Sequence, residues 1–129
     1  MDIGLTVRLD ASFQEAVERT RAALTEQGFG VLTEIDVQAT LREKLGEEME
    51  EYLILGACNP PLAHRALEVD RQIGLLLPCN VVVRTDETGT IVEALDPNVM
   101  VETTGEQALT PIATEAAQRL RAALDALAH

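Results

Sequence analysis

The chain is poor in aromatic residues, and this shortage limits how its interior can be built. Among 129 residues there is no Trp, one Tyr and two Phe. Leu, Val, Ile and Ala must therefore supply nearly all of the buried area, through close packing of aliphatic side chains. A hydrophobic content of 47% over this length suffices for a single domain, residues 1–129, without disulfide support.

Basic residues are also scarce. Ten Lys and Arg stand against 22 Asp and Glu, which gives a formal net charge of −12. Such a chain is repelled by a phosphate backbone and by an anionic membrane surface. We therefore expect neither nucleic acid nor a membrane among its partners.

Long apolar runs are missing as well. No stretch approaches the roughly 18 apolar residues of a membrane span. The chain does not start with a positively charged segment followed by an apolar run, as a secretory signal would. With only two cysteines and no such signal, the sequence predicts a cytoplasmic protein with free thiols.

The first half of the chain alternates between strand and helix patterns. Apolar residues at every second position predict a strand at residues 2–9. Ser12 and Glu15 form a capping box at the start of a helix that Gly28 ends. A second strand follows at residues 29–35, with Val31, Thr33 and Ile35 expected on one face.

The second half begins with a short helix, opened by Asp36 and closed by Gly46. Next comes a strand from about Met49 to Ala57 that is apolar on both faces, as interior strands are. Asn59 followed by Pro60 is typical of a helix start. The remaining expected elements are a strand at 81–84, a hairpin through 86–89 into 91–95, a short strand or irregular link at 98–102, and a long helix at about 106–126.

This order of elements predicts an α+β fold with the sequence β-α-β-α-β-α-β-β-α. We expect an antiparallel-rich sheet of about five to six strands, with two long helices and one or two short helices packed on one face.

Both cysteines lie in the central block, and each precedes an asparagine at a strand end. We take Cys58, Asn59, Cys79 and Asn80 as candidate ligand-binding residues. Cys58 comes just before a helix start, where the helix dipole would lower a thiol pKa. The alternative is that both cysteines are small buried side chains and that both asparagines serve as caps or turns.

Other chemistry finds little support in the sequence. Cys58, Cys79 and His64 give three soft ligands, but a closed zinc site needs a fourth, so no metal site is assigned. Ser12 is the only serine and is used as a cap, which leaves no Ser-His-Asp arrangement. Gly28 and Gly30 lead into a strand, unlike a phosphate-binding loop. No catalytic residue is assigned, and the cofactor is unknown.

The block from Tyr52 to Val83 resembles the domain-of-unknown-function family numbered 302. The resemblance rests on Cys58-Asn59-Pro60 and on Leu77-Pro78-Cys79-Asn80. It implies a compact α+β domain of the TATA-binding-protein-like fold, often dimeric and largely without assigned activity, so a homodimer is expected. Kinship of fold carries no inference of DNA binding.

Two function classes follow. The first is a non-enzymatic dimeric binding or assembly module with a pocket for a small-molecule ligand at the Cys58 and Cys79 strand ends. The second is a thiol-based redox or metal-handling protein that uses the same two cysteines.

Overall fold

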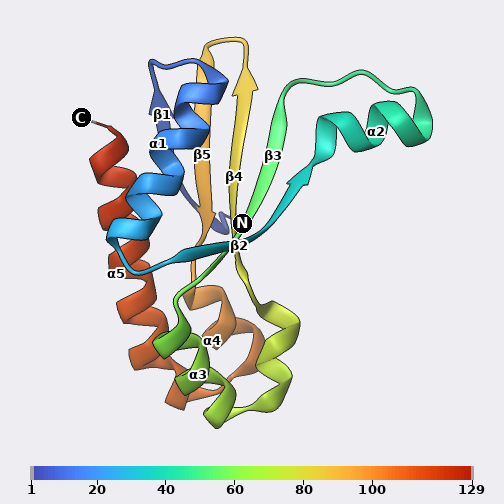
Figure 1. Ribbon diagram of the computed structural model, residues 1–129. Helices are drawn as coiled ribbons and strands as arrows, with labels where there is room; N and C mark the ends of the chain where they lie inside the picture. The colour runs from blue at the N-terminus through green and yellow to red at the C-terminus, as the bar shows by residue number, and fades with distance from the viewer. Residues whose placement is uncertain (1, 129) are drawn as a thin grey trace.

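The computed structural model describes residues 2–128, arranged as a sheet with helices at one face and one end (Figure 1). In chain order the elements are β1 (Gly4–Leu9), α1 (Phe13–Glu26), β2 (Gly30–Asp36), α2 (Val37–Leu45), β3 (Tyr52–Cys58), α3 (Pro60–Val69), the 3₁₀ helix η1 (Arg71–Leu76), β4 (Cys79–Asp86), β5 (Gly89–Leu95), α4 (Asn98–Thr104), the 3₁₀ helix η2 (Gln107–Leu109) and α5 (Thr110–Leu127).

The five strands form one sheet in the order β1-β5-β4-β3-β2, and every neighbouring pair is antiparallel. Helices α1 and α5 pack against each other and against one face of this sheet. On the opposite face, which we call the open face, Tyr52, Ile54 and Val82 stay partly exposed. The predicted α+β fold with an antiparallel sheet is confirmed.

The helix ends follow the local rules that predicted them. The Ser12 hydroxyl accepts a hydrogen bond from the Glu15 backbone N–H at 3.2 Å, and Asp36 accepts one from Ala39 at 2.9 Å. Gly46 ends α2 with a φ of 68°, a left-handed conformation that other residues adopt at a cost. These side-chain acceptors satisfy N–H groups that have no partner inside the helix.

Two apolar clusters hold the elements together. The first lies between the sheet and the helices α1 and α5, and its most buried members include Leu24, Leu55, Val83, Val92 and Leu120. The second lies at the end of the sheet, where α3, η1, α4, η2 and α5 meet, and it contains Leu62, Ala66, Ile73, Met100, Leu109, Ile112, Ala113 and Ala116. Each fully buried large aliphatic side chain stabilises the fold by roughly 1.5–3 kcal/mol.

Some expected elements are corrected. Residues 98–102, predicted as a short strand or irregular link, belong to helix α4. The Asp96 carboxylate accepts the Asn98 backbone N–H at 3.0 Å, and Pro97 is already helical with a φ of −60° and a ψ of −19°, so the chain turns into a helix after β5. The third strand begins at Tyr52 instead of Met49, and the last helix begins at Thr110 after the turn η2.

Strand β2 also differs from expectation, because its register shifts between Val31 and Thr33. Val31 packs against the first core cluster, whereas Thr33 pairs with Gly56 and Ile35 is 49% exposed. The prediction that these three side chains share one face is therefore wrong. Strand β2 pairs with β3 from Gly30 to Asp36, and helix α2 then extends away from the rest of the molecule (Figure 1); we call residues 30–45 the projecting arm.

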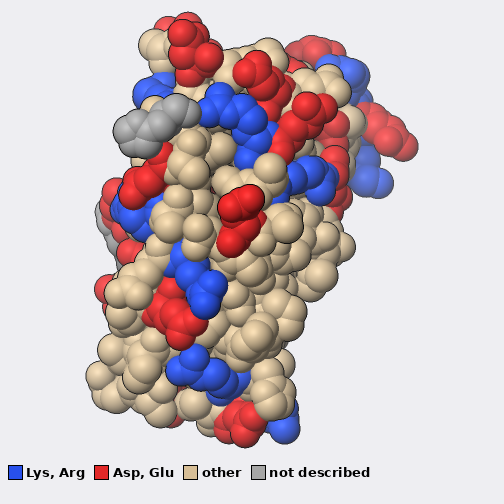
Figure 2. Space-filling view, turned by 60° about the vertical axis from the view of Figure 1, so that its left-hand side comes forward, with Lys and Arg blue, Asp and Glu red and all other residues tan. Residues whose placement is uncertain are grey.

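Charged side chains of both signs are mixed on the face that carries α1 and α5. Figure 2 shows Lys and Arg lying beside Asp and Glu there, without a continuous basic patch on that face. Examples are the pairs of Glu115 with Arg119 at 3.1 Å and with Arg65 at 3.4 Å. Within residues 2–128, no helix is both long and apolar enough to cross a membrane.

Candidate functional site

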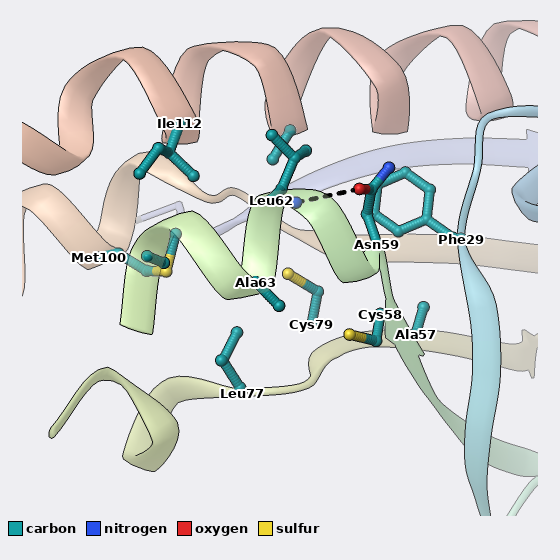
Figure 3. Close-up of a pocket in the computed structure, with 12 residues that line it drawn as sticks. Phe29, Ala57, Cys58, Asn59, Leu62, Ala63, Leu77, Cys79, Met100 and Ile112 are labelled. Carbon is teal, nitrogen blue, oxygen red and sulfur yellow. Dashed lines mark hydrogen bonds between the residues drawn. The ribbon is translucent and has the colours of Figure 1, made fainter. Parts of the chain in front are cut away.

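A small cavity of about 30 Å³ lies where β3 ends, β4 begins and α3 passes over both strands. We call it the sulfur cavity, because three sulfur-containing side chains line it (Figure 3). Its lining residues are Phe29, Ala57, Cys58, Asn59, Leu62, Ala63, Ala66, Leu77, Cys79, Met100, Ile112 and Ala116. A volume of this size holds one or two water molecules or a single ion, whereas organic ligands usually occupy about 300–1,000 Å³.

The register of β3 and β4 brings the two thiols together. Cys79 pairs with Ala57 across the antiparallel ladder, so Cys58 lies one position further along the neighbouring strand. Both sulfur atoms point into the space between α3 and Leu77 (Figure 3). Twenty-one residues of sequence separate the cysteines, and only the pairing of the two strands makes them neighbours.

Asn59 lines the same cavity and caps helix α3. Its side-chain oxygen accepts the Leu62 backbone N–H at 3.2 Å, and its side chain is only 8% exposed. Asn59 therefore fixes the first turn of α3 above the two cysteines, as the sequence predicted for a helix cap.

Asn80 is not part of this site. Successive side chains of a strand point to opposite faces, so the side chain that follows Cys79 turns away from it. Asn80 is exposed and lines a separate shallow hollow of about 360 Å³ beside Tyr52 and Val82 on the open face. The structure thus brings together three of the four candidate residues.

Burial controls the chemistry of the two thiols. It raises the pKa of Cys79 to about 11, with a further contribution from the nearby Cys58, and it raises the pKa of Cys58 as well. This is opposite to the lowering expected from the start of α3. At neutral pH both thiols are protonated, which makes them poor nucleophiles.

The sequence of α3 explains why its N-terminus does not activate Cys58. Pro60 and Pro61 have no N–H to donate. Asn59 takes the next two donors, since its side-chain oxygen accepts from Leu62 and its carbonyl oxygen accepts from Ala63 at 2.9 Å. The first turn therefore offers no free N–H group to stabilise a thiolate.

Met100 is the site residue that the sequence did not indicate. It lies on α4, is 4% exposed, and lines the cavity with the two cysteines. Residues 98–102 were expected to be a strand or link, so no sequence pattern placed Met100 at this cavity. His64, in contrast, is exposed and its Nδ1 lies 3.1 Å from Glu68, outside the cavity. Among residues 2–128, no group of three or more His, Cys, Asp and Glu is placed to hold a metal ion.

A five-stranded antiparallel sheet with two long helices on one face places this chain among the small α+β proteins. The family described as Domain of unknown function DUF302 matches residues 5–127, and the chain belongs to this family. A solved structure titled "Crystal structure of uncharacterized conserved protein DUF302 from Bacillus stearothermophilus" is 32% identical, with a TM-score of 0.92. The match covers 98% of this chain and 99% of that chain. No curated protein matches the sequence.

Proposed function

We propose that this protein is a non-enzymatic binding module that works as a homodimer, with a second copy covering the projecting arm and a very small ligand in the sulfur cavity. The observation that supports the dimer is the exposure of the arm. None of the nine residues of helix α2 is buried. Isolated helices this short are barely stable in water, so a partner surface would stabilise α2.

Apolar side chains on the arm fit this proposal. Five large hydrophobic residues within 2–128 are exposed, and Leu32, Ile35 and Leu45 of these lie on the arm. Their exposed fractions are 66%, 49% and 68%. Exposed apolar side chains concentrated on one segment are typical of protein interfaces, whereas single exposed residues are common on any surface.

The charges near the arm favour a second copy over other partners. Arg42 and Lys44 lie in the last turn of α2, and the acidic run of Glu47, Glu48, Glu50 and Glu51 follows directly. Arg42 already lies 3.5 Å from Glu48 of its own chain. A twofold axis that sets the basic turn of one copy against the acidic run of the other makes this favourable contact twice, because an isologous interface repeats each contact. The net charge of −12 makes nucleic acid and anionic membranes poor alternatives.

The sulfur cavity supports binding better than catalysis. Its polar groups are two protonated thiols and the side chain of Asn59, whose oxygen is already engaged in capping. Thiol redox chemistry, the alternative expected from the sequence, requires a reactive thiolate, and the raised pKa values work against it.

Sedimentation equilibrium over a range of concentrations tests the dimer. We expect the unmodified chain to be dimeric, and Ile35→Asp combined with Leu45→Asp to give a folded monomer. Leu75→Asp is the matched control, because Leu75 is 83% exposed but lies on η1, away from the arm. A monomeric unmodified chain would overturn the proposed dimer, and so would equal dissociation of the Leu75 variant.

A further inference from the structure

Three sulfur-containing side chains from separate parts of the chain line one cavity. Cys58 comes from the end of β3, Cys79 from the start of β4, and Met100 from α4 (Figure 3). We propose that the sulfur cavity is a binding site for copper(I), with the thiolates of Cys58 and Cys79 as the main ligands and the Met100 thioether on the α4 side of the same cavity. This deepens the ligand part of the proposed function and does not depend on the dimer.

The donor set selects the metal. Thiolate and thioether sulfur are soft ligands, which favour copper(I) over magnesium, calcium or manganese. Zinc normally takes four nitrogen, sulfur or carboxylate ligands in a structural site, and among residues 2–128 the lining supplies two thiols and no imidazole or carboxylate. The remaining lining residues are apolar except for Asn59, whose side-chain oxygen already accepts the Leu62 N–H.

The size and access of the cavity also suit a bare cation. A volume of about 30 Å³ accepts one ion but not a hydrated one or an organic molecule. Cys58 and Cys79 are partly exposed, whereas Met100 is 4% exposed, so we expect a cation to enter from the side of the cysteines. Copper(I) would therefore lose its previous ligands as it enters the cavity.

Binding exchanges protons for metal. Two S–H bonds break and two Cu–S bonds form, both protons leave to solvent, and no electron is transferred. The product carries one net negative charge. Among residues 2–128, the two thiols are the titratable groups that line the cavity. Copper(I) must displace these protons, so its affinity should rise with pH.

Anaerobic competition against a coloured copper(I) chelator tests this inference, with the full-length reduced chain. We expect one copper(I) per chain, release of two protons, and X-ray absorption showing sulfur ligands. Cys58→Ala and Cys79→Ala should each weaken binding by more than about a hundredfold, a larger loss than changes outside the ligand set cause. Alanine leaves a small apolar side chain, and a thermal melt of each variant checks that the fold is kept.

Two methionine variants provide a matched comparison for the copper(I) affinity. Met100→Leu should weaken copper(I) binding by about tenfold, and Met49→Leu should leave it unchanged, because Met49 does not line the cavity. Failure of the unmodified chain to take copper(I) from the chelator would overturn the inference, as would unchanged affinity in the folded cysteine variants or equal affinity for zinc. Sedimentation of the same samples reports the dimer separately, so loss of one property is distinguished from loss of the other.

Discussion

Thr33 of β2 packs directly over Gly56 of β3, next to the register shift in this edge strand. A methyl group at position 56 would overlap the Thr33 hydroxyl and lie 2.9 Å from Cγ of Pro78. Glycine is therefore required here by the close approach of two side chains.

Gly56→Ala should destabilise the protein by about 1–3 kcal/mol, because the added methyl forces neighbouring groups apart in a packed region. Urea denaturation measures the loss. The double variant Gly56→Ala with Thr33→Ala should recover part of it, since the overlapping hydroxyl is gone. Gly74→Ala is the control, because no atom lies within 4 Å of the position its methyl would take. Equal stability of the Gly56 and Gly74 variants would show that the close packing is not a constraint.

Asn59→Ala should destabilise the protein by about 1 kcal/mol, because the Leu62 N–H loses the acceptor that caps helix α3. Asn59→Ser keeps a side-chain acceptor and should retain most of the stability. Asn80→Ala tests the other candidate asparagine, which is exposed on the open face, and its effect should stay within about 0.5 kcal/mol. The free energy of unfolding from chemical denaturation compares the three, and a larger loss in the Asn80 variant would contradict the assigned roles.

Asp86, at the β4–β5 hairpin, makes the stability of the fold depend on pH. The Arg8 guanidinium, together with the Thr88 backbone N–H and hydroxyl, holds the pKa of the Asp86 carboxyl well below its usual range. Because this pKa is lower in the folded state, the contribution is complete above the unfolded-state pKa of about 3.9 and is lost as the pH falls toward the folded-state value.

Two variants should therefore lose less stability than the unmodified chain when the pH falls below about 4. Asp86→Asn removes the titrating group, and Arg8→Gln removes its cationic partner while leaving the carboxyl in place. Urea denaturation at a series of pH values measures the difference, and NMR titration follows the Asp86 carboxyl directly. Variants that follow the same acid profile as the unmodified chain would show that the hairpin ion pair is not linked to folding.

Local sequence by itself determined most of the secondary structure. Ser12, Asp36 and Asn59 begin helices, and Gly46 ends one, because each acts on backbone groups within a few residues of itself. The apolar pattern of β3 likewise indicated an interior strand. The helix at 98–102 could not be predicted in this way, because an apolar pattern over five residues fits a strand as well as a helix. The turn made by Asp96 and Pro97 decides for the helix.

The candidate site was decided only by the tertiary structure. The sequence pointed to Cys58, Asn59 and Cys79, but the pairing of β3 with β4 is what places the two thiols at one cavity. The alternation of side chains along β4 places Asn80 on the other face of the sheet. The packing of α4 in the second apolar cluster places Met100 at the cavity. The pKa of each thiol also depended on the fold, because desolvation is set by everything that surrounds a group and not by its neighbours in sequence.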